Sequence, residues 1–424
     1  KDYDTRHRCF VDGSPAVGDV KDGTDWRTIL VGGLAGGGAG YYALDITDQI
    51  NPRVLWEFRR KPGCTPTTPV GAARHAASGI ARLSEDCDLG FSFGNPVITK
   101  LPSGQWVVMV TSGYNNHVNG DGRGYLYVLD AMTGAIVHKT TTGAGDSVTP
   151  SGFARIAAWA DNPLKDNTTK YVYGGDLFGK LWKFDFTGGG APAVSLLFDA
   201  GPGKPITARP ELGTVTNPIT NVKKRVVFFP TGRLLGNSDL ADTRPQSFYG
   251  IWDWLGGAAP TNPLVAATVS AGGRGRVGTV YDPNGDGRPD SVFDDDANPG
   301  WQLDFPVAGE RGATDPTLAF GTLVFSTSLP RTPDPCNPSG FTSWVYNIDF
   351  RSGGVVHVPG STNTHIAVEY AGAATRPNVF TLPGGQVKSV TRVTDKDVTN
   401  QIDDVRHSGG AGVLRRIGWR ELTK

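Results

Sequence analysis

The sequence has little charge and no excess of either sign. Only 19% of its 424 residues are charged, and 41 acidic residues balance 41 basic ones, so the formal net charge is zero. Nucleic acids and anionic membranes attract basic surfaces, so neither is expected as the main partner. No apolar run approaches the roughly 18 residues that a membrane-spanning helix needs, so we expect no transmembrane segment.

The chain also opens without a signal peptide, on Lys1-Asp2-Tyr3-Asp4. We therefore expect it to be a mature segment or a C-terminal fragment of a longer protein.

Cysteine is scarce: Cys9, Cys64, Cys87 and Cys336 are the four. None forms a CxxC pair, and no histidine stands near them at zinc-ligand spacing, which argues against a zinc site. Cys64 and Cys87 flank a loop rich in proline and glycine, which favours a disulfide between them in an exported protein. Four buried free thiols are the alternative. The pairing of Cys9 and Cys336 stays open.

The usual catalytic motifs are missing as well. The sequence contains no HExxH, GxSxG or Walker A pattern, and its seven histidines are scattered singly. One GxGxxG string, at Gly273, Gly275 and Gly278, opens no recognisable helix, so a flexible loop explains it better. We expect no catalytic residues and no enzyme activity.

Glycine and aromatic residues are abundant and follow a repeat. The chain has 58 glycines, 30 prolines and ten tryptophans, a composition of many turns around aromatic cores. A short apolar strand, a glycine turn and a Gly-aromatic-x-aliphatic-Asp strand recur, loosely in the last two copies. The five copies span residues 27–45, 106–130, 171–185, 226–253 and 323–349. We interpret their terminal aspartates as structural, because a carboxylate at a strand end can accept N–H groups of the following turn.

Further strand-like runs before and after the copies give units of four antiparallel strands, as in the blades of a propeller. The prediction is an all-β, modified β-propeller with long loop insertions, one domain over residues 1–424. Blade size favours seven blades, with six as the alternative, and residues 412–419 are the candidate closing strand. Separate β-sandwiches are the competing architecture, but no linker divides the units.

The strongest chemical signal is the segment 282–290, DPNGDGRPD. Oxygen-bearing side chains stand at its first, third, fifth and ninth positions, and a glycine stands at the sixth, where calcium loops turn sharply. The predicted Ca²⁺ ligands are Asp282, Asn284, Asp286, the backbone carbonyl of Arg288, and Asp290. Calcium takes six to eight oxygen ligands, and three carboxylates favour a doubly charged ion.

A solvated Asp/Asn/Gly turn is the alternative for this segment. Phe293 occupies the twelfth position, where an EF-hand has an acidic residue, so an EF-hand is not expected. A weaker version of this calcium-loop pattern begins at residues 119–124. Its ninth position is Tyr127, which is not a calcium ligand, so we interpret the segment as a hairpin turn. The aspartates at 294–296 are interpreted as a plain acidic turn, and the basic run 223–225 as a solvated strand entry.

Several stretches together resemble the C-terminal domain of the PilY/PilC family of type IV pilus biogenesis factors and tip-associated adhesins. They are residues 7–15, 26–34, 174–185, 309–311, 334–336, 343–344 and 419–422. The resemblance implies a modified propeller with a calcium loop like that at 282–290, whose occupancy is linked to pilus extension against retraction. It also implies export to the pilus tip, outer surface or periplasm of a Gram-negative bacterium. Minor pilins would be partners, with host cell-surface molecules as further ones.

Two other functions compete with this one. A quinoprotein dehydrogenase has propeller blades with a similar Gly-aromatic-x-Leu-Asp strand and holds calcium, but its typical adjacent cysteine pair is absent from this sequence. A receptor- or glycan-binding propeller with a purely structural calcium is the second. Adhesion by a von Willebrand A-like domain cannot be assigned to this chain, which lacks a DxSxS motif.

Overall fold

The computed structural model describes residues 10–64, 74–75, 82–118, 120–163, 165–218, 220–254, 260–272, 275–286, 289–332, 340–358, 360–383, 385–394 and 399–406. Cys9, Cys336, Gly287, Arg288 and the expected closing strand 412–419 lie outside these residues. Within them, the helical elements are three short 3-10 turns, η1(Ala35–Gly37), η2(Asn237–Ala241) and η3(Val292–Asp294), and the rest of the regular structure is β-strand. The all-β prediction is confirmed.

The chain divides into two compact units. Among the described residues, one unit contains those up to Asp199 and the other contains those from Ala200 onward. The predicted single-domain span over residues 1–424 and the predicted count of seven or six blades stay predictions.

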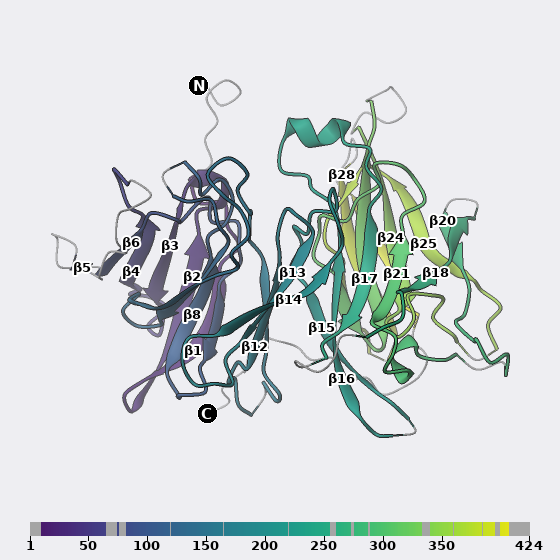
Figure 1. The fold of residues 1–424 in the computed structure, drawn as a ribbon, viewed down its shortest axis with the longest axis horizontal. Coiled ribbons are helices and arrows are strands. Elements are labelled where there is room, and N and C mark those ends of the chain that lie inside the picture. Colours follow the sequence, from purple (N-terminus) through teal and green to yellow (C-terminus); the bar gives the residue numbers. More distant parts are fainter. Residues whose placement is uncertain are drawn as a thin grey trace. The chain divides into compact units, whose positions relative to one another are not determined.

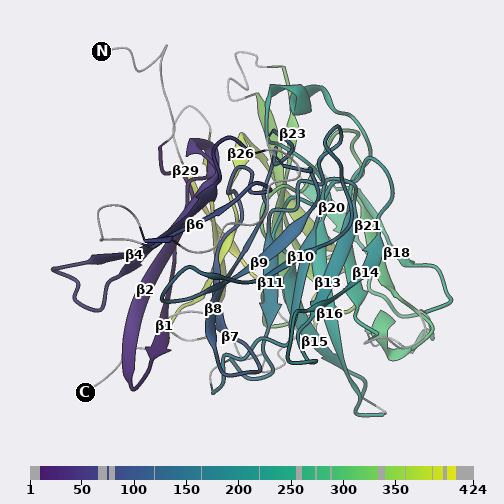
Figure 2. The same ribbon diagram turned by 60° about the vertical axis from the view of Figure 1, so that its left-hand side comes forward.

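The described residues of the first unit form three sheets. The first has the order β1-β2-β3-β4-β6-β5, with β1(Ala16–Asp22), β2(Asp25–Gly33), β3(Gly40–Asp45), β4(Arg53–Arg60), β5(Arg74–His75) and β6(Arg82–Asp86). The second is β10-β9-β8-β7, with β7(Val97–Lys100), β8(Trp106–Thr111), β9(Tyr125–Asp130) and β10(Ile136–Thr141). The third is β11-β12-β13-β14, with β11(Ile156–Trp159), β12(Tyr171–Gly175), β13(Lys180–Asp185) and β14(Ala193–Asp199). Figure 2 shows the β1–β2 hairpin of the first sheet in purple, on the left.

Neighbouring sheets of this unit pack face to face. Val31 and Trp56 of the first sheet share one buried cluster with Tyr127 of the second. The Trp56 indole N–H donates to the carbonyl of Ala131 at 2.9 Å, so this large side chain is buried without losing its hydrogen bond. Burial of alternate strand residues against the next sheet is what a propeller blade requires, since a blade cannot cover both its faces alone.

The described residues of the second unit form three further sheets, drawn in teal to yellow in Figure 1. The first is β15-β16-β17-β21-β18, with β15(Glu211–Thr216), β16(Lys223–Pro230), β17(Ser247–Trp252), β18(Val265–Ala267) and β21(Gly300–Asp304). The second is β19-β20-β25-β24-β23-β22, with β19(Val269–Ala271), β20(Gly275–Gly278), β22(Thr317–Ala319), β23(Thr322–Pro330), β24(Phe341–Asp349) and β25(His365–Ala371). The third pairs β28(Val387–Thr394) with β26(Ala373–Ala374), β27(Asn378–Thr381) and β29(Thr399–Asp404).

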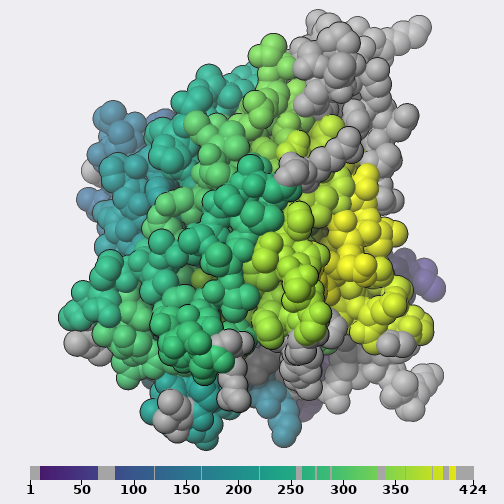
Figure 3. Space-filling model, turned by 90° about the vertical axis from the view of Figure 1, so that its right-hand side faces the viewer, coloured from purple at the N-terminus to yellow at the C-terminus, as the bar shows by residue number. Residues whose placement is uncertain are grey.

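Aromatic residues fill the core of the second unit. Phe248 stacks on Trp301 with ring centroids 5.9 Å apart, and on Phe325 at 4.2 Å. Phe325 in turn stacks on Tyr346 at 4.8 Å. The chain from β17 to β21 forms an insertion over two sheets, because β18 pairs with β21 while β19 and β20 extend the sheet of β25. Figure 3 shows the green surface that includes this insertion beside the yellow-green surface of the later strands.

The sequence repeat corresponds to the central hairpins β2–β3, β8–β9, β12–β13, β16–β17 and β23–β24. The structural interpretation of its aspartates agrees with their contacts. Asp45, Asp130 and Asp185 each accept a backbone N–H from the following turn, at 2.8–3.1 Å. Asp349 does the same with Arg351 at 2.8 Å. These aspartates terminate strands and are not a reactive cluster.

Candidate calcium loop and its surroundings

The predicted calcium loop lies in the insertion, between β20 and η3. Its base is closed by a hydrogen bond from the Asp290 amide to the Tyr281 carbonyl, at 2.8 Å. At its tip, Asp282 Oδ1 accepts the amides of Gly285 and Asp286 at 2.9 and 3.2 Å. Asn284 Oδ1 accepts the Asp286 amide at 3.0 Å. The predicted ligands Asp282, Asn284 and Asp286 therefore lie in one turn, and Asp290 lies at the base of the loop.

Lys224 lies under the acidic segment that follows the loop. Its ammonium donates to the carbonyl of Phe293 at 2.6 Å and to Asp296 Oδ1 at 2.5 Å, and it lies 4.5 Å from the centroid of the Trp252 ring. The Lys224 side chain is only 4% exposed. The interpretation of residues 223–225 as a solvated strand entry is therefore wrong for this residue, because β16 alternates and turns it inward toward an acceptor 69 residues away.

Arg351 supplies a second cation beside the loop. Its carbonyl accepts the amide of Val292 at 3.1 Å, and its guanidinium binds both carboxylate oxygens of Asp349 at 3.1 and 2.8 Å. Those hydrogen bonds raise the pKa of Arg351, and the nearby Asp294 and Asp290 carboxylates raise it further. Burial raises the pKa of Asp294, with Arg351 opposing the rise and Asp290 adding to it.

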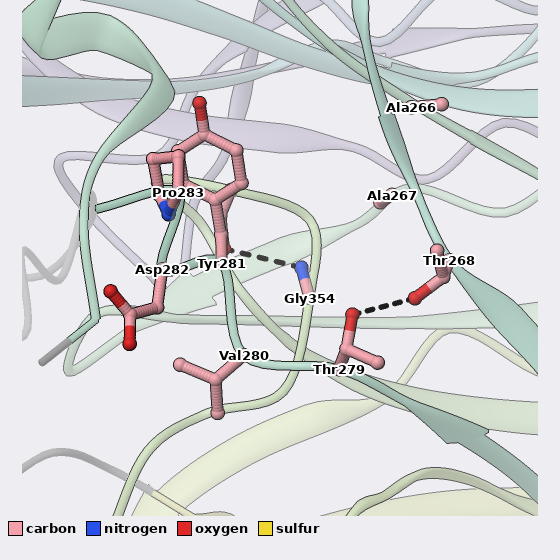
Figure 4. A pocket seen from close by; sticks show the side chains of 10 residues that line it. Ala266, Ala267, Thr268, Thr279, Val280, Tyr281, Asp282, Pro283 and Gly354 are labelled. Atoms are coloured by element: carbon pink, nitrogen blue, oxygen red, sulfur yellow. Dashed lines mark hydrogen bonds between the residues drawn. The ribbon is translucent and has the colours of Figure 1, made fainter. Parts of the chain in front are cut away.

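A small cavity of about 270 Å³ adjoins the loop (Figure 4). Its walls are residues 266–268, residues 279–283, and Ser352 with Gly354. The hydroxyls of Thr268 and Thr279 are 2.6 Å apart, and the Asp282 carboxylate points away from this pair in Figure 4. Asp282 thus belongs both to the cavity wall and to the predicted ligand set.

Comparison with known proteins decides the family. The model of the PilY1 beta-propeller domain matches residues 1–279. The chain belongs to the PilY1 β-propeller family.

Two curated relatives of this family show how much of a longer protein the chain represents. The type IV pilus biogenesis factor PilY1 of Pseudomonas aeruginosa is 31% identical over 402 residues, which cover 82% of this chain and 31% of that protein. A PilY1 homolog of Xylella fastidiosa is 26% identical over 449 residues, covering 100% of this chain and 32% of that protein. The chain therefore spans about a third of the length of these relatives.

A solved structure agrees with the family. The crystal structure of the Pseudomonas aeruginosa PilY1 C-terminal domain matches with a TM-score of 0.64 and 26% identity, covering 92% of this chain and 85% of that one. In the described part of this PilY1-family chain, no helix is long and apolar enough to cross a membrane.

The residues of this PilY1-family loop fit calcium by their chemistry. Carboxylate and amide oxygens are the hard donors that calcium prefers. Four residues beyond the loop, on η3, Asp294 Oδ1 is buried without a hydrogen-bond partner. The donors are not gathered in advance, since no group of three or more His, Cys, Asp or Glu able to hold a metal occurs among the described residues. With Gly287 and Arg288 outside those residues, the ligand assignment stays a prediction.

The disulfide pair selected from the sequence is bonded in this PilY1-family structure. Cys64 and Cys87 have Sγ atoms 2.18 Å and Cα atoms 5.6 Å apart, and Cys87 is buried. In the weaker version of the calcium-loop pattern, Asp121 accepts hydrogen bonds from the Arg123 amide at 2.9 Å and from the Tyr125 hydroxyl at 2.6 Å. Its carboxylate is used to hold its own hairpin together.

Sequence reasoning missed the two cations of this site. Lys224 stands in a basic run that looked solvent-exposed, and Arg351 follows a strand-ending aspartate whose role looked purely structural. One feature of the sequence could have indicated nearby cations: six aspartates stand from position 282 to position 296. So many negative charges in a short segment are stabilised by positive charges close to them.

Proposed function

We propose that this chain is the calcium-responsive propeller module of a type IV pilus biogenesis factor. In this proposal, occupancy of loop 282–290 biases pilus extension against retraction and so changes twitching motility. The module works without enzymatic activity, at the pilus tip, the outer surface or in the periplasm. Its partners are minor pilins, together with host cell-surface molecules where the factor contributes to adhesion and virulence. The names of its relatives support the link to the pilus.

One observation supports the calcium part of this proposal: the two ends of the loop are held in place, and its tip is acidic. The Tyr281–Asp290 hydrogen bond closes its base, and Val292 and Phe293 just beyond it are buried in the core. The tip residues Asp282 and Asp286 lie on an exposed turn. A change at the tip can therefore occur while the blades stay folded.

The aspartates of the loop provide the switch. Asp282, Asp286 and Asp290 repel one another while no cation lies between them. A bound calcium ion supplies the charge that removes this repulsion and coordinates six to eight oxygens. Because Asp282 also lines the cavity, its rotation into the ligand set would change a surface that a partner can contact.

Calorimetry on Asp290→Ala tests the ligand assignment. We expect the unchanged chain to bind calcium in the range of roughly micromolar to millimolar, as surface loops of this kind do. Removal of one charged ligand should weaken binding by about tenfold or more, which corresponds to about 1.4 kcal/mol. Asp48→Ala is the matched control, since Asp48 also accepts turn amides, of Ile50 and Asn51, in the other unit. Unchanged affinity in Asp290→Ala would remove Asp290 from the ligand set.

Cells test the regulatory part. Asp290→Ala in the full-length protein should shift the balance of extension and retraction, and Asp290→Lys should imitate the occupied loop because its ammonium can lie among the remaining carboxylates. If affinity falls and yet extension, retraction and adhesion are all unaffected, calcium is merely structural. A quinone absorbance in the purified protein would contradict the non-enzymatic part of the proposal.

A further inference from the structure

We propose that Lys139 and Asp88 are a covalent modification site, at which the two side chains join in an intramolecular amide bond and Asp86 transfers the protons. The bond links the first and second sheets of the first unit. Tension along the chain then bypasses the segment between residues 88 and 139. The site lies outside loop 282–290 and does not depend on calcium.

The register of the second sheet directs Lys139 toward the first sheet. Lys139 on β10 lies directly opposite Tyr127 on β9, and opposite residues of an antiparallel pair share one face of their sheet. Tyr127 is buried in the cluster that the first and second sheets share. On the other side of that cluster, β6 ends at Asp86, and the Ser84 hydroxyl donates to the Gly134 carbonyl at 2.7 Å. The end of β6 therefore lies against the β9–β10 hairpin.

Two carboxylates meet the Lys139 ammonium there. Its Nζ lies 2.6 Å from Asp88 Oδ2 and 2.9 Å from Asp86 Oδ1. The side chains of Lys139, Asp88 and Asp86 are 17%, 14% and 1% exposed. The ring centroids of Tyr125 and Tyr127 lie 4.4 and 5.8 Å from Nζ. Ionised groups are costly where little water reaches them, so conversion of an ammonium and a carboxylate into a neutral amide is favoured at this place.

Asp86 is positioned to move protons between the reacting groups. Its Oδ1 accepts the Tyr127 hydroxyl at 2.9 Å and the Asp88 amide at 2.8 Å, which fixes the carboxylate beside both Lys139 and Asp88. Its Oδ2 is buried without a hydrogen-bond partner among the described residues, so this oxygen can carry a proton. A base within hydrogen-bond reach of a nucleophile is the arrangement that nucleophilic reactions of side chains require.

The reaction needs no other reactant. Asp86 takes a proton from the Lys139 ammonium, and the neutral Nζ attacks Cγ of Asp88. A C–N bond forms, and the bond between Cγ and one carboxylate oxygen breaks. The nitrogen gives up two protons in all, Asp86 passes them to the departing oxygen, and one water molecule leaves. The two opposite charges disappear together, nothing is oxidised or reduced, and Asp86 ends as it began.

A plain ion pair is the competing explanation, because short Lys–Asp distances occur elsewhere. Lys388 Nζ and Asp404 Oδ1 are 2.5 Å apart, but the Asp404 side chain is 78% exposed. Water stabilises the ionised form of such a carboxylate, so we expect no amide bond there. Lys388 is therefore a matched control within the same chain.

Mass spectrometry of the unchanged chain is the experiment. After reduction of the disulfide, the intact chain should weigh less than its sequence by the mass of one water molecule. Trypsin should fail to cleave after Lys139 and should still cleave after Lys388. Digestion should release a branched peptide that joins residues 83–100, which contain Asp88, to residues 124–155, which contain Lys139. Because the disulfide is reduced, it cannot account for this link.

Variants test the role of each residue. Asp88→Asn should give the same product with loss of ammonia in place of water, because the amide nitrogen is then the leaving group. Lys139→Arg and Asp86→Asn should have the masses of their sequences. Asp86→Ala is a second variant if Asp86→Asn does not fold, as judged by circular dichroism.

The sequence mass together with complete cleavage after Lys139 in the unchanged chain overturns the proposal, whatever the variants do. A branch point that fragmentation locates at Asp86, or an amide bond that still forms in the folded Asp86 variant, overturns the assigned roles. Neither result affects the proposed function, which calcium binding tests separately.

Discussion

The buried ion pair between Glu310 and Arg276 should be among the most sensitive points of the second unit. Glu310 is fully buried and accepts hydrogen bonds from the Thr327 hydroxyl at 2.7 Å, the Tyr346 hydroxyl at 2.9 Å and the Arg276 guanidinium at 3.4 Å. Arg276 is 5% exposed and lies 4.2 Å from the centroid of the Trp344 ring. It stands on β20, so this pair fastens the strand that leads into the calcium loop to the core.

Glu310→Gln removes the negative charge and keeps the size of the side chain. The amide can still accept one or two of the hydroxyl hydrogen bonds, but Arg276 is left buried without a counter-ion. Removal of one partner of a buried pair costs about 3–5 kcal/mol, because the remaining charge has lost water and gained nothing in exchange. That is a large part of the stability of a domain. The double variant Arg276→Met with Glu310→Gln should regain at least about half of the loss, since it removes the orphaned charge.

Equilibrium unfolding in urea, followed by tryptophan fluorescence, measures these losses. The two compact units can unfold separately, so the transition to be compared is the one in which Trp344 fluorescence changes. Asp404→Asn is the control, because its ion pair with Lys388 has one partner 78% exposed and should contribute less than about 0.5 kcal/mol. A loss below about 1 kcal/mol in Glu310→Gln, or no recovery in the double variant, would refute the reasoning.

Three further predictions concern single features of the fold. Asp242→Asn should flatten the pH dependence of stability. The Arg244 guanidinium that is hydrogen-bonded to the Asp242 carboxyl lowers the pKa of this carboxyl to about 2, so the ionised carboxylate stabilises the native state above about pH 4. In urea unfolding, the unchanged chain should therefore lose about 2 kcal/mol more than the variant between about pH 6 and pH 2. Gly250→Ala should cost about 1–3 kcal/mol, and less than that when measured in a Trp301→Leu background, because an added Cβ would lie 2.5 Å from the indole; an unchanged thermal midpoint would contradict this. Replacement of Cys64 and Cys87 by serine should cost roughly 3 kcal/mol for a loop of 23 residues, and alkylation of both cysteines without reduction would show that the bond is absent in solution.

The aspartates of the repeat show how far local patterns reach. Asp130 ends a strand and accepts the amides of Met132 and Thr133, so a carboxylate and the turn after it form one unit within four residues. Interactions of this range follow from neighbouring residues alone, which is why the strand hairpins and their turns were predictable. The disulfide was predictable for a similar reason, because two cysteines 23 positions apart in the sequence close only a short loop.

Long-range pairing was not predictable in the same way. Nothing near residues 265–278 in the sequence shows that β18 joins β21 in parallel while β20 joins β25. Such strands are short, and their partners stand tens of residues away, so the choice depends on how the sheets stack and which edges they leave open. The blade count and the closing strand depend on the same long-range closure, and they remain predictions.

The sequence by itself determined the all-β class, the repeat, and the order of oxygen donors from Asp282 to Asp290, because each depends on spacing along a few residues. Only the tertiary structure decided what faces those donors. It brings Lys224 on β16 and Arg351 in the turn after β24 to the acidic segment that lies between them in sequence. The physical reason is that coordination chemistry is encoded by residue type and local spacing, whereas the electric field at a site is the sum over every charge that folding brings within about a Debye length.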